Sequence, residues 1–325
     1  MRQKTEKRVN MNEVDYTAEL FGNYDENIKI IEEKYQVSIV LRQGEIVILG
    51  ELEKANAVEQ LLHNLIEILR AGERLDLQKI NYAIKLLEEG QENQLSSLLE
   101  GVLCISARGK QIKPKTLGQK KYVEAIKSND VVFGIGPAGT GKTYLAMVMA
   151  VTAFKNKEVS KIILTRPAVE AGESLGFLPG DLQEKVDPYL RPLYDALYDI
   201  LGAELFLKYK ERGMIEVAPL AYMRGRTLDD SFIILDEAQN TTKEQMKMFL
   251  TRLGLGSKAV ITGDITQIDL PKGKESGLKQ VIDILSDVNG ISFLFLNEND
   301  VVRHELVQKI IRAYDKFEKR ESGQK

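Results

Sequence analysis

The chain has 325 residues, enough for two domains of ordinary size, and its 43% hydrophobic and 29% charged residues are typical of a globular protein. Its net charge of −3 excludes a uniformly basic nucleic-acid binder, so any such binding must come from local patches. Its single cysteine, Cys104, excludes an internal disulfide, and with only two histidines it leaves no structural zinc site.

The first sixteen residues, MRQKTEKRVNMNEVDY, lack the apolar core of a signal peptide. No apolar run in the chain approaches the roughly 20 residues that a membrane span needs. A lone cysteine fits a reducing compartment. We therefore expect a cytoplasmic protein without membrane contact.

Residues 1–72 show a compact alternation of short apolar runs. Val14–Leu20 predicts a short strand, and residues 28–35 carry apolar side chains at helical spacing. Residues 37–41 and 45–49 predict two strands, and a long helix with an apolar stripe follows up to residue 70. The predicted order is β-α-β-β-α, and ENIKIIEEKYQVSIVL resembles the helix and second strand of a small KH-type RNA-binding domain.

The loop of this KH-like domain departs from the family pattern. KH domains clamp a nucleic-acid backbone with a G-x-x-G loop, whereas here the sequence is Gly22-Asn23-Tyr24-Asp25. Its aspartate repels phosphate, and residues 1–72 hold thirteen acidic and nine basic side chains. These charges favour a KH-like fold used for assembly or protein contacts over direct RNA binding. Residues 73–101 predict a helical linker to a second domain of residues 102–325.

A basic stretch opens the second domain. A short strand is predicted at 102–106, and residues 107–127 then hold seven Lys or Arg and one Glu. Arg108 and Lys110 are candidate contacts to RNA phosphates. The bound nucleotide and a neighbouring subunit are the alternative partners of these two side chains. Gln119 stands where superfamily 1 helicases, which this region resembles, have an adenine-reading glutamine. Its amide has the donor and the acceptor that adenine requires.

Residues 131–143, VVFGIGPAGTGKT, form the pattern of a phosphate-binding loop. An apolar strand precedes the loop and a helix-forming run follows it, as the pattern requires. Glycines let the backbone N–H groups surround a phosphate, and the helix N-terminus adds its positive end. Lys142 is expected to reach the β- and γ-phosphates and Thr143 to hold Mg²⁺. The predicted nucleotide-binding residues are Gly136, Pro137, Ala138, Gly139, Thr140, Gly141, Lys142 and Thr143, with Gln119.

Five further apolar runs predict strands separated mostly by helices. This alternation predicts an α/β domain, a RecA-like P-loop NTPase with a parallel sheet and helices on both faces. Ligands of such sheets bind at the carboxyl ends of the strands. The predicted strands are 161–166, 215–220, 231–235, 259–264 and 291–297.

Two carboxylates follow the strand at 231–235. Asp236 is expected to hold Mg²⁺ through water, and Glu237 to polarise the water that attacks the γ-phosphate. A kinase acting on a small acceptor needs no such base, because its acceptor is not water. The pair therefore favours hydrolysis of ATP.

Further polar residues resemble superfamily 1 helicase motifs. In TGDITQID, Asp264 and Gln267 match a motif whose glutamine senses the γ-phosphate or the attacking water. Arg166 follows the strand at 161–166, where those helicases contact single-stranded nucleic acid. Arg224 and Arg226 precede the Asp236 strand and suit phosphate or RNA contacts.

Six ordered motifs together resemble the PhoH-like ATPase family. They are GPAGTGKT, TRPAVEAGESLGFLPGDLQEK, APLAYMRGRTL, FIILDEAQNTT, ITGDITQIDLP and DVVRHELVQKII. The resemblance implies a cytosolic ATP-binding protein linked to RNA metabolism, and to phosphate starvation in some bacteria. It also implies a partner, an endoribonuclease that processes rRNA.

The sequence contains one helicase-like lobe, whereas superfamily 1 helicases close their ATP site with a second lobe that supplies an arginine. After the last predicted strand only a helical stretch remains. Arg303 in that stretch is the candidate arginine, acting in its own chain or in a neighbour. Supply from a neighbour implies a ring-like or head-to-tail homo-oligomer.

Three functions remain open at this level. The first is an ATPase that remodels or moves along single-stranded RNA. The second is a nucleotide-switched scaffold for a partner endoribonuclease, without unwinding activity. The third, a small-molecule kinase, conflicts with the Asp236–Glu237 pair.

Overall fold

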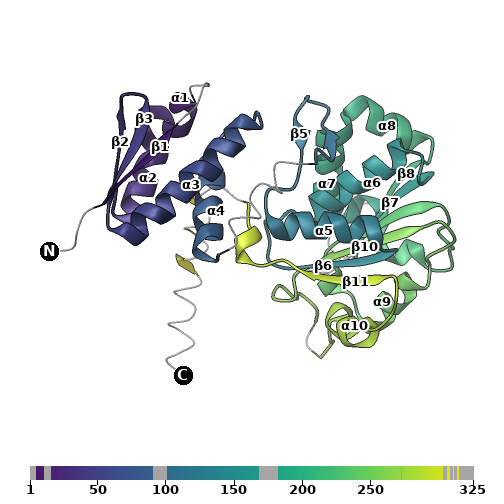
Figure 1. Cartoon of the computed structure of the whole chain (residues 1–325). Coiled ribbons are helices and arrows are strands. Elements are labelled where there is room, and N and C mark those ends of the chain that lie inside the picture. The colour runs from purple at the N-terminus through teal and green to yellow at the C-terminus, as the bar shows by residue number, and fades with distance from the viewer. Residues whose placement is uncertain are drawn as a thin grey trace. The chain divides into compact units, whose positions relative to one another are not determined.

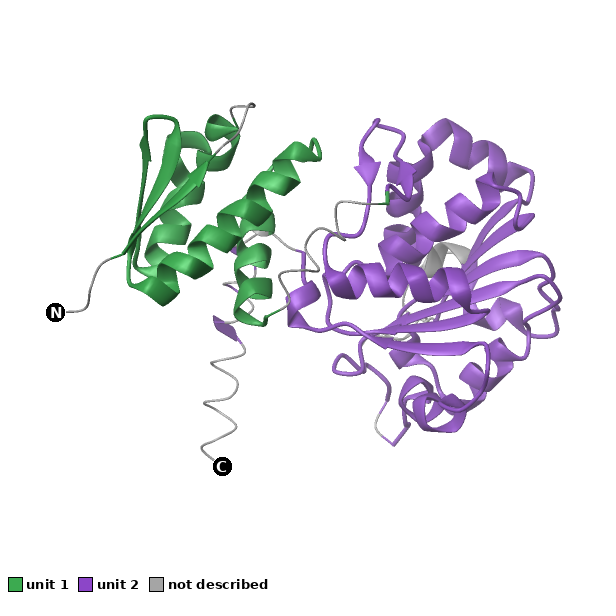
Figure 2. Cartoon of the chain, in the orientation of Figure 1, with its two compact units in different colours: residues 1–101 green, residues 102–325 purple. Residues whose placement is uncertain are grey.

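The computed structural model describes residues 5–10, 16–90, 101–167, 182–271 and 273–302, with positions 306, 307, 310, 313 and 314. The chain divides into two compact units, unit 1 with residues 1–101 and unit 2 with residues 102–325 (Figure 2). None of the described helices is long and apolar enough to cross a bilayer.

Unit 1 begins with an antiparallel sheet of three strands in the order β1-β3-β2 (Figure 1). Helices connect and cover these strands, so the element order is β-α-α-β-β-α, and the expected small α+β, KH-like domain is confirmed. The elements are β1 (Thr5–Asn10), α1 (Thr17–Phe21), α2 (Glu26–Tyr35), β2 (Ser38–Arg42), β3 (Glu45–Gly50) and α3 (Leu52–Arg70).

The predicted strand at Val14–Leu20 is wrong. Residues 17–21 form α1, with Leu20 as its buried side chain, and the first strand is Thr5–Asn10. β1 reads TEKRVN and buries only Val9, so it has no apolar stripe that the sequence pattern could reveal. Pairing with β3 along its full length holds this charged strand in place.

α4 (Leu77–Glu88) belongs to the core of unit 1, although it lies in the segment expected to be a linker. Its N-terminus is capped by Asp76, whose Oδ1 accepts from the Lys79 N–H over 2.8 Å. Ile80 and Ile84 are buried. α4 packs against α3, whose buried side chains include Val58, Leu61, Leu62, Leu65 and Leu69.

Unit 2 is built on a parallel sheet of six strands in the order β11-β6-β10-β9-β7-β8 (Figure 1). The expected α/β P-loop fold is confirmed. The strands are β6 (Val131–Ile135), β7 (Lys161–Arg166), β8 (Ile215–Pro219), β9 (Ser231–Leu235), β10 (Lys258–Gly263) and β11 (Ile291–Phe295).

Helices cover both faces of this sheet because its strands are apolar on both sides. In β9, Phe232 and Ile234 point into one buried cluster, and Ile233 and Leu235 into the other. The first cluster lies under α5 (Leu117–Ser128), α6 (Lys142–Lys155), α7 (Leu182–Leu201) and α8 (Ala203–Glu211). The second lies under α9 (Lys243–Leu250) and α10 (Gly277–Leu285).

The strand predicted at 102–106 is shorter and lies outside the main sheet. β4 (Cys104–Ile105) pairs only with β5 (Gln111–Ile112), in an antiparallel hairpin. The turn between them is closed by the Ser106 N–H, which donates to the Lys110 carbonyl over 2.9 Å. The hairpin therefore presents part of the basic stretch at the surface.

Candidate active site

The loop of residues 136–141 leads from β6 into α6. Position 136 has no room for a side chain, because a Cβ on Gly136 would lie 2.5 Å from the Leu296 carbonyl oxygen. Gly141 is the N-cap of α6 with φ 78°, a backbone conformation that favours glycine. A glycine-rich loop that ends at the N-terminus of a long helix is an anion-binding arrangement.

Lys142 is the first residue of α6 and is buried. Its Nζ donates to the carbonyl oxygens of Gly136, at 2.6 Å, and Pro137, at 2.9 Å. Nζ also lies 3.3 Å from Thr140 Oγ1. The ammonium group is thus held inside the loop, where the sequence pattern places the phosphates.

The segment that follows β11 is tied to the same loop. The Leu296 N–H donates to the Ile135 carbonyl over 2.7 Å, and the Val302 N–H to the Gly139 carbonyl over 2.9 Å. Between them, the buried Asp300 accepts from Thr116 Oγ1 over 2.6 Å. Residues 296–302 therefore connect the loop with the residue that caps α5.

Gln119 lies in the first turn of α5 and is buried against the loop. Its Nε2 donates to the Thr140 carbonyl over 3.0 Å, and its Oε1 accepts from the Lys115 N–H over 2.7 Å. The structure thus brings Gln119 to the phosphate-binding loop and engages both ends of its amide with backbone groups. Adenine recognition by this amide stays a prediction.

Tyr122 lies behind the loop strand, fully buried. A Cβ on Gly134 would approach its ring to 2.6 Å, so this glycine makes room for the phenol. Burial, and to a lesser degree the charge of Asp236, raises the pKa of Tyr122 well above its ordinary value. The phenol therefore stays neutral and adds no charge beside the carboxylate.

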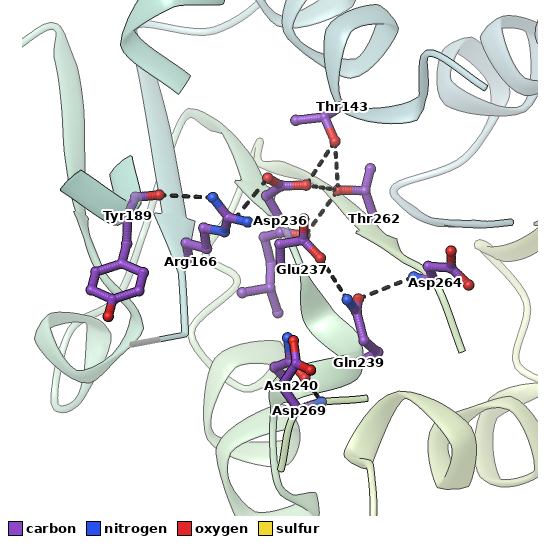
Figure 3. A network of polar contacts seen from close by, with 11 residues as sticks. Thr143, Arg166, Tyr189, Asp236, Glu237, Gln239, Asn240, Thr262, Asp264 and Asp269 are labelled. Carbon is purple, nitrogen blue, oxygen red and sulfur yellow. Dashed lines mark hydrogen bonds and ion pairs between the residues drawn. The ribbon is translucent and has the colours of Figure 1, made fainter. Parts of the chain in front are cut away.

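Asp236 follows β9 and joins two hydroxyl groups from neighbouring elements (Figure 3). Thr143 Oγ1 and Thr262 Oγ1 both donate to its Oδ1 over 2.7 Å. A carboxylate and a hydroxyl at this spacing are the oxygen ligands that Mg²⁺ prefers. Among the described residues, no group of three or more His, Cys, Asp or Glu side chains could hold a metal by itself, so a Mg²⁺ ion here would take the rest of its shell from phosphate oxygens and water.

Glu237 has both carboxylate oxygens engaged. Arg166 Nη2 donates to its Oε1 over 2.9 Å, and Gln239 Nε2 donates to its Oε2 over 2.5 Å. Its backbone is left-handed, with φ 52°, which is uncommon for glutamate. Glu237 is therefore held in a defined position directly beside Asp236.

Arg166 ends β7, next to β9 in the sheet. Besides Glu237, its Nη1 donates to the Tyr189 carbonyl of α7 over 2.8 Å, and its Nε lies 4.0 Å from Asp236 Oδ2. The arginine predicted as a nucleic-acid contact thus hydrogen-bonds to Glu237 and lies at the limit of ion-pair distance from Asp236.

Comparison with known proteins decides the family. The family model described as PhoH-like protein matches residues 111–315, which include the loop and both carboxylates. The chain belongs to the PhoH-like family. The expectation from its ordered motifs is confirmed.

Relatives from several bacteria are similar to this PhoH-like chain over most of their length. A PhoH-like protein of Bacillus subtilis is 57% identical over 302 residues, covering 93% of this chain and 95% of the relative. One of Mycobacterium tuberculosis is 54% identical, with coverage of 95% and 88%. Protein PhoH of Escherichia coli is 43% identical, with coverage of 70% and 67%.

A solved Sulfolobus solfataricus SWI2/SNF2 ATPase core in complex with dsDNA is a remote match. It is 16% identical with a TM-score of 0.35, and the match covers 57% of this chain and 46% of that one. A likeness at this level carries no conclusion about function.

The turn after β10 holds the third predicted feature of the PhoH-like site. Asp264 is buried, and its N–H donates to Gln239 Oε1 over 3.0 Å, which connects it to Glu237 (Figure 3). Its Oδ1 accepts from both the N–H and the hydroxyl of Thr266. Gln267 is exposed, and its backbone N–H bonds to the Asp264 carbonyl. Its role as a γ-phosphate sensor stays a prediction.

The predicted RNA residues of this PhoH-like chain have different surroundings. Arg108 and Lys110 are exposed in the β4–β5 turn, and Arg224 is exposed before β9. Arg226 instead forms a bidentate ion pair with Glu216, at 2.6 and 2.8 Å, and hydrogen bonding to this carboxylate raises the pKa of Arg226. Arg303 lies outside the described residues.

Two residues of the network were not singled out from the sequence. Thr262 bonds to Asp236, and Gln239 bonds to Glu237. The signals existed, because Thr262 precedes the Gly-Asp of TGDITQ and Gln239 ends the Asp-Glu-Ala-Gln motif. Their partners, however, depend on which strands lie side by side.

Proposed function

We propose that this chain binds ATP with Mg²⁺ at the loop of residues 136–143 and hydrolyses it in response to single-stranded RNA. The hydrogen bond of 2.7 Å between Thr143 and Asp236 carries the proposal. It joins the end of the phosphate-binding loop to a carboxylate that is followed at once by a second one, Glu237. This is the arrangement that phosphoryl transfer to water requires.

The sheet order supports hydrolysis rather than transfer to a bulky acceptor. β10 lies between the loop strand β6 and the carboxylate strand β9. Two strand spacings separate the ends of β6 and β9 by about 10 Å. A γ-phosphate and one water molecule fit between a phosphate loop and a carboxylate at that separation, so Glu237 can orient the water.

Each residue then has a distinct role. Lys142 binds oxygens of the β- and γ-phosphates, and Glu237 accepts the hydrogen bond of the attacking water. Thr143 and Asp236 would hold Mg²⁺, which neutralises charge on the phosphates when it is bound. Gln119 is the proposed adenine contact and Gln267 the proposed γ-phosphate sensor.

RNA and protein partners are part of the proposal. Arg108, Lys110 and Arg224 are exposed on unit 2, and they support contacts to an RNA backbone. Because the overall charge of the chain is slightly negative, RNA binding would depend on such local basic side chains. Arg303, from the same chain or from a neighbour in a ring-like homo-oligomer, is the proposed arginine that completes the site. An endoribonuclease that processes rRNA is the proposed protein partner, and the cytoplasm is the proposed compartment.

The decisive experiment is the steady-state ATPase rate with and without single-stranded RNA. Wild type is expected to hydrolyse ATP faster with RNA. Lys142→Ala is expected to lose ATP binding. Glu237→Gln is expected to keep ATP binding and to lose roughly 10²–10⁴-fold in rate, because the general base is gone. Lys279→Ala and Glu211→Gln, exposed positions of unit 2, are the matched controls.

Two outcomes would contradict the proposal in different ways. An unchanged rate with RNA, together with ATP-dependent capture of an endoribonuclease, would indicate the nucleotide-switched scaffold. A phosphorylated acceptor and a fully active Glu237→Gln variant would indicate a kinase.

A further inference from the structure

The carboxylate of Glu237 is held by donors from two different elements. Arg166 comes from the end of β7, and Gln239 from the short 3-10 helix after β9 (Figure 3). One binds Oε1 and the other Oε2. A carboxylate has about four acceptor positions, and here a guanidinium and an amide occupy one on each oxygen, so the strongest hydrogen bonds of this 37% exposed side chain go to protein donors.

The left-handed backbone of Glu237 fits a position that can change. A glutamate at φ 52° persists only where its surroundings hold it there, and such residues cluster at functional and switch sites. Here the Asn240 N–H donates to the Glu237 carbonyl over 3.0 Å and holds the backbone, and the carboxylate is held by the two side-chain bonds just described. Loss of either one therefore favours a different orientation of the carboxylate.

Arg166 lies on the far side of Asp236 from the phosphate-binding loop. Oδ1 of Asp236 faces Thr143 and Thr262, whereas Oδ2 faces the guanidinium of Arg166. The sheet order agrees, because β7 and β6 lie on opposite sides of β9. A ligand on that side of Asp236 would meet Arg166 rather than Lys142 and Thr143, so the γ-phosphate is not the expected competitor for this guanidinium.

Arg166 is accessible enough for such a ligand. Its side chain is 21% exposed, and its third contact is the backbone carbonyl of Tyr189 at 2.8 Å. Arginine binds phosphate and carboxylate through the same planar fork of donors. A phosphodiester therefore offers this guanidinium the same kind of anionic oxygen acceptor as the Glu237 carboxylate.

We infer that Arg166 is a positioning residue that withholds Glu237 from the attacking water until a backbone phosphate of single-stranded RNA takes over its guanidinium. The inference rests on the proposed RNA-dependent ATPase and gives it a mechanism. RNA bound at Arg166 removes the arginine from Oε1, and Glu237 then accepts a hydrogen bond from water. RNA binding and hydrolysis are coupled through one side chain.

The coupling has a consequence that needs no nucleotide. Glu237 and RNA compete for one guanidinium, so removing the charge of Glu237 must strengthen RNA binding. Binding free energies are linked reciprocally, so the variant that is expected to be inactive becomes the tighter RNA binder. A residue with a merely structural role would not produce this result.

The test is a double-mutant cycle on the full chain without nucleotide. Fluorescein-labelled oligouridylate is titrated against wild type, Glu237→Gln, Arg166→Gln and the double variant. Glu237→Gln is expected to bind at least about fivefold tighter than Glu211→Gln, which removes the same charge elsewhere on unit 2. Arg166→Gln is expected to bind more weakly than wild type, and the double variant to match Arg166→Gln.

Several results would overturn the inference. They are equal affinities of Glu237→Gln and Glu211→Gln, additive effects in the double variant, or no RNA binding by Glu237→Gln. Thermal melting of each variant shows that it is folded. Because the titration uses no ATP, a wild type that fails to hydrolyse ATP would contradict the proposed function without deciding this cycle.

The ATPase rate supplies a second readout. Arg166→Gln is expected to raise the ATPase rate without RNA about tenfold, because a charge-assisted bond no longer holds Glu237. The ratio of the rates with and without RNA is expected to fall toward one. Arg166→Lys keeps a positive charge and is expected to retain part of the stimulation. A lower RNA-free rate with full stimulation in Arg166→Gln would overturn the inference.

Discussion

Two loops in this molecule each lead into a helix through a left-handed N-cap and differ in charge. Residues 22–25 of unit 1 and residues 136–141 of unit 2 both begin with a glycine at positive φ. Both end in a left-handed N-cap without a side-chain cap, Asp25 at φ 60° before α2 and Gly141 at φ 78° before α6.

The charges at the two helix N-termini are opposite. In unit 1 the N-cap itself is a carboxylate, Asp25, whereas in unit 2 the first helical residue is Lys142. A helix N-terminus attracts anions, and a carboxylate already present there opposes them. A left-handed N-cap therefore does not by itself make a phosphate site, and side-chain charge distinguishes the two loops.

The largest expected effect follows from giving the unit 2 loop the charge of the unit 1 loop. Lys142→Glu places a carboxylate among the groups that bind phosphate. We expect ATP affinity to fall roughly a thousandfold, about 4 kcal/mol, because a negative charge replaces the buried positive charge that pairs with the phosphates. Titration calorimetry measures it, with Lys279→Glu as the control. An affinity within tenfold of wild type would contradict the proposed site.

The second prediction concerns the backbone of the same loop. Gly136→Ala brings a Cβ to 2.5 Å from the Leu296 carbonyl, and neither backbone can yield easily. We expect a loss of about 1–3 kcal/mol in unfolding free energy, and weaker ATP binding. Gly213→Ala is the matched control, since its φ is +66° but its Cβ would meet nothing within 4 Å. Chemical denaturation and ATP titration of both variants measure the difference. Equal ATP affinities would show that close approach at Gly136 does not matter.

The third prediction moves the unit 1 loop toward a phosphate-binding one. Asp25→Gly relieves the backbone strain of an aspartate in the left-handed conformation, and it removes a negative charge. We expect the unfolding free energy to rise by up to about 1 kcal/mol and RNA affinity at low salt to rise a few-fold. Asp25→Asn separates the two causes, because it removes the charge and keeps a side chain. Unchanged RNA affinity in both variants would exclude this loop as an RNA contact.

The smallest effect is expected at Tyr24, whose side chain is 93% exposed in the same loop. Tyr24→Ala should leave the unfolding free energy within about 0.5 kcal/mol of wild type, since no packing is lost. RNA affinity should also stay unchanged if the acidic loop makes no RNA contact. A clear loss of affinity would instead indicate base stacking on the tyrosine, and would weaken the comparison drawn from charge.

Local patterns predicted the parts of the site that lie close together in the chain. The loop of residues 136–143 and the Asp236–Glu237 pair are each continuous in sequence and follow a buried strand. Their side chains do meet, through Thr143 and Asp236.

The Arg166–Glu237 bond joins residues 71 positions apart, and Thr116 and Asp300 are 184 apart. Such pairs depend on strand order, which periodicity does not contain. β1 was missed for a different reason, because a charged edge strand with a single buried side chain has no alternating signature.

The bonds that tie residues 296–302 to the phosphate-binding loop have a practical consequence. Val302 donates to Gly139, so a fusion tag or surface attachment placed directly after this residue would transmit tension to the loop through one hydrogen bond. Glu298 is exposed in the same segment, two positions before Asp300. A fluorophore at that position would report loop movement on nucleotide binding, while a tag for immobilisation belongs on unit 1.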